Sequence, residues 1–82
     1  MISAEDFLSA SFESQVRLLY EQGSCVMSIR YYGYKVNLYL MGDFYVEVFY
    51  NHKKDMIEKI VPLDVQHTRF TFYTDQIQLP AI

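Results

Sequence analysis

The chain has few of the residues that build several common kinds of site. Its 82 residues include no tryptophan, one cysteine, two prolines and three glycines. One cysteine excludes an intramolecular disulfide framework and a zinc site built from several cysteines. The glycines are isolated at 23, 33 and 42, so there is no glycine-rich phosphate loop. Half of the chain is hydrophobic, which predicts a single small globular domain over residues 1–82.

Basic residues are also scarce, and the net charge is −3. A nucleic-acid-binding protein normally carries a basic stripe, and none is visible, so we expect no nucleic-acid partner. The excess of acid lies in residues 1–23, where one base, Arg17, accompanies four acids: Glu5, Asp6, Glu13 and Glu21.

No targeting or membrane segment is recognisable. The first residues have neither the basic start nor the apolar stretch of a signal peptide. No uncharged apolar run approaches the roughly 18 residues that a membrane span needs. Together with the unpaired cysteine, these features predict a cytoplasmic protein with no membrane contact.

Residues 4–22 have the pattern of one amphipathic helix. Ser3 is suited to cap its first turn, and Gly23 to end it. A break at residues 9–11 is the alternative, because Ser11 is a second residue suited to a cap. The spacing predicts one buried stripe, made of Leu8, Phe12, Val16 and Leu19.

After Gly23 the apolar residues repeat with a period of two, which predicts strands. We expect strands over residues 24–32, 34–41, 44–50, 56–61 and 69–74, followed by a tail over 75–82. The predicted fold is α+β, with the N-terminal helix packed on a four- to five-stranded antiparallel meander.

The glycine turns predict the register of the first three strands. A two-residue turn at 32–33 pairs apolar residues with one another: Tyr31 with Tyr34, Ile29 with Val36, Met27 with Leu38, and Cys25 with Leu40. This alternation turns Cys25 inward as a small core residue.

For the second hairpin we expect a three-residue loop at 41–43, which pairs Leu38 with Val46. A two-residue turn would place Leu38 opposite Glu47 and mix the faces. For the strand over 56–61, a pairing of Lys59 with Glu47 is electrostatically attractive, and a neighbouring register stays open.

The face turned away from the helix is unusually aromatic. It carries the candidate interaction surface, made of Arg30, Tyr32, Tyr39, Tyr45, Glu47 and Phe49. Tyrosine, phenylalanine and a central arginine are enriched in interface cores. Contact with a second chain is our first interpretation. Cover by the fifth strand or the tail is an alternative, and a platform for a small molecule or nucleobase is another.

Residues with catalytic or metal-binding chemistry are few. His52 and His67 lie in polar segments without clustered acids, so we expect no metal site. Glu47 stands between two valines in mid-strand. It is either a general base or a cross-strand partner for a Lys or Arg.

We therefore expect a non-catalytic protein without a cofactor. It would self-associate as a homodimer, or bind another protein, through the aromatic face or an edge strand. The rival hypothesis is an acidic adaptor or immunity-like module that docks its helix on a basic protein. A third interpretation is an enzyme or small-molecule binder centred on Glu47, with Arg30 and Tyr39 or Tyr45.

Overall fold

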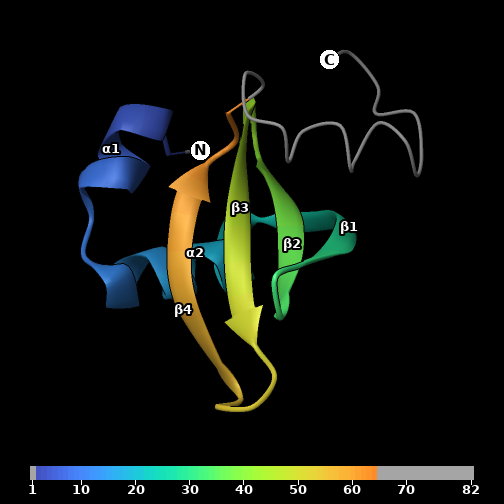
Figure 1. Cartoon of the computed structure of the whole chain (residues 1–82). Helices are drawn as coiled ribbons and strands as arrows, with labels where there is room; N and C mark the ends of the chain where they lie inside the picture. Colours follow the sequence, from blue (N-terminus) through green and yellow to red (C-terminus); the bar gives the residue numbers. More distant parts are fainter. Residues whose placement is uncertain (1, 65–82) are drawn as a thin grey trace.

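A computed structural model of the chain describes residues 2–64. Two short helices are followed by a four-stranded antiparallel sheet of order β1-β2-β3-β4 (Figure 1). The helices are α1 (Ala4–Ser9) and α2 (Phe12–Gln22). The strands are β1 (Ser24–Tyr31), β2 (Tyr34–Met41), β3 (Phe44–Asn51) and β4 (Met56–Pro62). The predicted α+β fold and these four strands are confirmed, and the strand expected at 69–74 lies outside the described residues.

The predicted single helix is two helices, because Ala10 is extended (φ −74°, ψ 159°). Ser3 caps α1 by accepting a hydrogen bond from the Asp6 amide, and Ser11 caps α2 by accepting one from the Ser14 amide. The break changes the helical phase. Phe7 and Leu19 are buried, whereas Leu8 and Phe12 of the predicted stripe are exposed.

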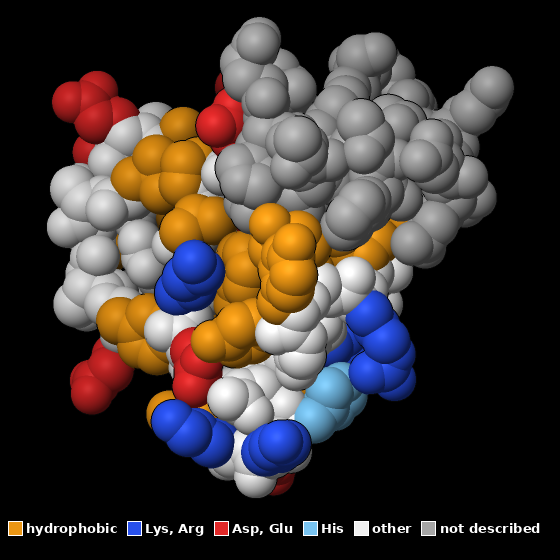
Figure 2. Space-filling view, in the orientation of Figure 1, with side chains coloured by type: hydrophobic (Ala, Val, Ile, Leu, Met, Phe, Trp, Pro, Cys, Tyr) orange, Lys and Arg blue, Asp and Glu red, His pale blue; other side chains and the backbone are white. Residues whose placement is uncertain are grey.

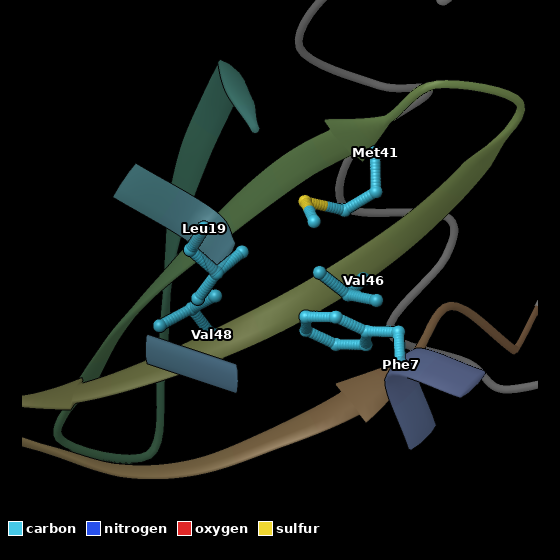
Figure 3. Packing of buried hydrophobic residues seen from close by; sticks show 5 residues of the cluster. All are labelled: Phe7, Leu19, Met41, Val46 and Val48. Carbon is cyan, nitrogen blue, oxygen red and sulfur yellow. The ribbon is translucent and has the colours of Figure 1, made fainter. Parts of the chain in front are cut away.

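The sheet has an inner face, which the helices cover, and an outer face. In Figure 1 the helices lie behind and beside the sheet. The inner face carries a core that we call the inner cluster: Phe7, Leu19, Met41, Val46 and Val48 (Figure 3). The Phe7 ring meets the Phe44 ring at 5.9 Å between centroids. The outer face carries a second core, the outer cluster, made of Ile29, Val36, Leu38 and Phe49.

The first hairpin has the predicted turn. Tyr32 and Gly33 both have positive φ (48° and 84°), as a type I′ turn requires. Its pairs Ile29–Val36 and Met27–Leu38 are confirmed. A bulge between Cys25 and Met27 then shifts the register, so Cys25 lies opposite Tyr39. The prediction that Cys25 is a core residue is therefore wrong, because the bulge moves it to an exposed position.

The predicted register of the second hairpin is wrong. The turn has two residues, Gly42 (φ 76°) and Asp43, and it places Leu38 opposite Glu47 and Val36 opposite Phe49. The pairing that mixes the faces is possible because both faces of this sheet bury apolar side chains. As a result, Val36 and Leu38 belong to the outer face, while Val46 and Val48 belong to the inner face.

The register of β4 also differs from the predicted pairing of Lys59 with Glu47. Lys59 lies opposite Phe49, and Glu47 lies opposite Val61. The Lys59 ammonium stands 4.5 Å from the centroid of the Phe49 ring, which is a cation–π contact. A bulge at Phe49/Tyr50 leaves Glu58 without a cross-strand pair.

Candidate interaction surface

The corrected register divides the six residues of the candidate interaction surface between two faces. Tyr45, Glu47 and Phe49 share the outer face, because they lie opposite Leu40, Leu38 and Val36. Tyr39 packs against the inner cluster, and Arg30 lies opposite Lys35 on that same face. Tyr32 occupies the β1–β2 turn, with 86% of its surface exposed. The six residues therefore do not form one surface.

The outer-face members are largely buried. Glu47 is 1% exposed and Phe49 is 2% exposed, and Tyr45 packs against the outer cluster. Figure 2 shows this face, with hydrophobic side chains around a Lys. A partner could reach Phe49 or Glu47 only after a rearrangement. Glu47 and Phe49 are therefore not directly available for docking, although other hydrophobic side chains are visible on this face (Figure 2).

The exposed apolar residues of the described chain gather on the helices instead. Of the five large hydrophobic side chains that are exposed among residues 2–64, Leu8, Phe12 and Tyr20 are helical. Phe12 (44% exposed), Val16 and Tyr20 (76% exposed) follow one another at a spacing of four on α2. That spacing places them in one row along the helix. We call this row the α2 stripe.

The α2 stripe lies beside the buried side of the helix. Gln15 and Leu19 face the sheet, and the Gln15 side-chain amide donates to the Phe7 carbonyl at 2.9 Å. This bond holds α1 against α2 and fixes which side of α2 is buried. The sequence predicted Val16 and Phe12 as core. The capping residue Ser11 was the sequence signal for a second helix, and a second helix changes which side chains share the buried face.

At the C-terminal end of α2 the stripe meets the sheet. Burial raises the pKa of Tyr39, and the nearby Cys25 and Tyr20 raise it further. Cys25 lies opposite Tyr39 in the sheet, so the C-terminal end of α2 adjoins the start of β1 and the end of β2.

A charged row borders the α2 stripe. Glu13, Arg17 and Glu21 follow at a spacing of four. Among residues 2–64 the structure shows one salt bridge, between Lys54 and Glu58 (3.5 Å). Arg17 donates to the Ser14 hydroxyl at 3.5 Å rather than to a carboxylate. The charges of this row are therefore available to a second molecule.

Both edges of the described sheet are poorly suited to pairing with another strand. Each edge strand, β1 and β4, is involved in a bulge. Pro62 ends β4. The Leu63 amide donates inward to the Tyr45 carbonyl (3.1 Å), so the neighbouring Pro62 stands where an amide would point outward. Bulges and an edge proline are common means of preventing edge-to-edge pairing.

A hydrogen-bond network fixes the β3–β4 turn. Glu58 accepts from the Tyr34 hydroxyl (2.7 Å) and the Asn51 amide (3.2 Å), beside its salt bridge to Lys54. The Tyr34 bond lowers the pKa of Glu58, and the same bond raises the pKa of Tyr34. In the same turn, Tyr50 donates to Asp55, which raises the pKa of Tyr50.

The described residues also bear on the metal, membrane and Glu47-pocket predictions. Within residues 2–64, no group of three His, Cys, Asp or Glu side chains is placed to hold a metal ion. No described helix has the length and apolar character to cross a membrane. A hollow beside the β1–β2 turn is lined by Ser28, Ile29, Arg30, Lys35 and His52, and Glu47 is not in its wall.

No protein-family model, curated protein or solved structure matches this chain. The surfaces and their chemistry are therefore the basis for a functional proposal.

Proposed function

We propose that this protein is a non-catalytic interaction module that self-associates, with the α2 stripe of one copy packed against that of a second. The observation that carries the proposal is the row Phe12–Val16–Tyr20, in which Phe12 and Tyr20 are exposed on either side of the half-buried Val16, on a helix whose other apolar side is already buried. An isolated exposed aromatic residue is ordinary, whereas two exposed aromatic residues in one row of a helix indicate an interface. Tyrosine is also enriched among residues that dominate binding energy.

The α2 stripe is self-complementary. Across a two-fold axis at Val16, two antiparallel helices would place Phe12 of each copy beside Tyr20 of the other. Residues i and j then contact j and i, as an isologous interface requires. Phe12 and Tyr20 are eight positions apart, which corresponds to about 12 Å of helix. An interface of this length is at the small end of the range, so we expect micromolar or weaker affinity.

The bordering charges fit the same arrangement. In the antiparallel pair, Arg17 of one copy approaches Glu13 of the other. Both are free of ion pairs within the described chain. Such rim charges contribute orientation and association rate more than affinity. We therefore expect added salt to weaken the dimer only modestly.

Sedimentation velocity over about 10 µM to about 1 mM protein tests the proposal. The wild type should shift from 9.7 kDa toward twice that mass. Tyr20→Ser and Phe12→Ser should each weaken association by about tenfold or more, because each removes the Phe12–Tyr20 contact on both sides of the two-fold axis. Circular dichroism of each variant checks that the fold is retained.

Tyr32→Asn is the matched control. It removes the most exposed aromatic residue named above, at 86%, from a turn far from α2, so it should leave association unchanged. A wild-type monomer at every concentration would refute the proposal. So would a dimer that Tyr20→Ser and Phe12→Ser leave intact.

A further inference from the structure

We propose that the hollow at the turn end of the sheet binds a phosphate dianion, either inorganic phosphate or the terminal group of a phosphate monoester. The hollow has a volume of about 440 Å³ and is lined by Ser28, Ile29, Arg30, Lys35 and His52. It lies where the β1–β2 and β3–β4 turns meet. Figure 2 shows Lys, Arg and His side chains gathered at this end of the molecule.

The pairing of Arg30 with Lys35 is the first observation. They lie directly opposite each other on β1 and β2, and the next residue across the sheet is the neutral Tyr50. Like charges in directly opposite positions destabilise a sheet. The fold gains nothing from this pair, so a ligand that neutralises both charges gives a reason for it.

The acids at this end of the sheet are already engaged. Asp55 accepts from the Tyr50 hydroxyl. Glu58 binds Tyr34, Asn51 and Lys54. Neither acid lines the hollow. Arg30 and Lys35 have exposed side chains and form no salt bridge among the described residues. The hollow therefore has a positive wall that the acids among residues 2–64 leave uncompensated.

The lining groups fit a phosphate in particular. An arginine guanidinium donates two parallel hydrogen bonds to an oxyanion, and a lysine ammonium adds a compact charge. A phosphate monoester carries close to two negative charges at neutral pH, which matches the two permanent cations. His52, whose ring contacts the Tyr50 ring at 5.2 Å, and the Ser28 hydroxyl add further donors.

The volume leaves room for more than the anion. The hollow is open to solvent on one side rather than enclosed, and its volume of about 440 Å³ exceeds that of one phosphate group. A ligand with a body attached to its phosphate would therefore fit. The comparison of inorganic phosphate with a monoester such as adenosine monophosphate distinguishes the two sources.

Two-dimensional ¹H–¹⁵N NMR of the full chain tests the site. Inorganic phosphate and adenosine monophosphate are titrated separately, with sodium chloride holding the ionic strength constant. Saturable shifts at the amides of residues 28–30, 35 and 52 would support the proposal. If adenosine monophosphate binds more tightly than inorganic phosphate, the nucleoside part of the ligand also contacts the site. If the two bind with equal affinity, the site recognises the phosphate group alone.

Charge-removing variants give the second readout. Arg30→Gln and Lys35→Gln should each weaken phosphate binding by about tenfold, since each removes a charge-assisted contact. Lys53→Gln is the matched control, because Lys53 is an exposed base of the neighbouring turn outside the hollow. It should bind phosphate as the wild type does. Lys35→Gln relieves the like-charge pair, so it should not lower the melting temperature without ligand.

Three outcomes would overturn the proposal. The first is no saturable shift with either probe up to about 50 mM, a concentration at which even a weak site fills. The second is equal loss of binding in Lys53→Gln, which would indicate general attraction. The third is a single-stranded oligonucleotide that binds far more tightly than the monoester. The Tyr20→Ser variant should still bind phosphate, so this site and self-association fail independently.

Discussion

Leu38 on β2 lies directly opposite Glu47 on β3, and both side chains are buried on the outer face. This pair follows from the two-residue turn at Gly42-Asp43. It sends Val46 and Val48 to the helices and Leu38 to the other face. The sheet therefore stabilises two cores, one on each side.

The outer cluster should contribute as much to stability as a conventional core. Leu38 is fully buried, and Leu38→Ala should lower the free energy of unfolding by about 2–5 kcal/mol, through lost burial and the cavity that remains. Leu40→Ala is the matched control. Leu40 lies on the same strand and face but belongs to neither cluster, so its loss should be smaller. Urea unfolding measures both variants, and equal losses would contradict the two-core description.

Gly23 joins α2 to β1 at a point where a side chain has no room. A Cβ there would lie 2.7 Å from the Leu19 carbonyl oxygen and 2.9 Å from the Met41 sulfur. The backbone at Gly23 is extended (φ −88°), so the lack of space is what requires glycine. Gly23→Ala should therefore lower the free energy of unfolding by about 1–3 kcal/mol, as overpacking does.

Gly33 provides the contrast for Gly23. A Cβ at Gly33 meets no atom within 4 Å, but φ is +84°. Asparagine tolerates this left-handed conformation better than alanine. Gly33→Asn should therefore be less destabilising than Gly33→Ala, whereas at Gly23 asparagine should be no better than alanine. Thermal unfolding of the four variants tests this comparison. If Gly23→Asn melts at a higher temperature than Gly23→Ala, glycine is needed at position 23 for its backbone conformation rather than for lack of space.

The Tyr34–Glu58 hydrogen bond should stabilise the protein over a defined range of pH. Because the folded pKa of Glu58 is lowered, its contribution is present above the ordinary carboxyl value of 4.5 and is lost as pH falls through the folded pKa. Because the folded pKa of Tyr34 is raised, its contribution is present below 10.0 and is lost as pH rises through the folded value. Tyr34→Phe should therefore be destabilising near neutral pH and closer to wild type at both extremes.

Urea unfolding of wild type and Tyr34→Phe across the pH range measures this difference. Tyr45→Phe is the control, because its hydroxyl makes no hydrogen bond among the described residues. The stability difference between Tyr45→Phe and wild type should not vary with pH. A constant difference for Tyr34→Phe would show that the hydroxyl acts through packing rather than through the carboxylate.

Local chemistry in the sequence accounts for much of the fold. Ser3 and Ser11 cap helices because a hydroxyl can accept from an amide three residues on, whatever surrounds it. Gly33 permits the I′ turn through its own backbone. The period-two pattern placed all four described strands close to their observed bounds. Each of these depends on neighbours in the chain and so is visible without the rest of the molecule.

Only the tertiary structure decided which side of the sheet each residue faces. Two turns fit residues 41–44, and the choice between them depends on both faces being buried, which no local pattern shows. The bulge between Cys25 and Met27 likewise reverses one phase and exposes Cys25. Arg30, Lys35 and His52 come together because two separate turns meet at one end of the sheet. Which face a side chain lies on, and which side chains line the hollow, depend on pairing between segments that are distant in the sequence. The sequence of one strand does not specify its register with a neighbouring strand.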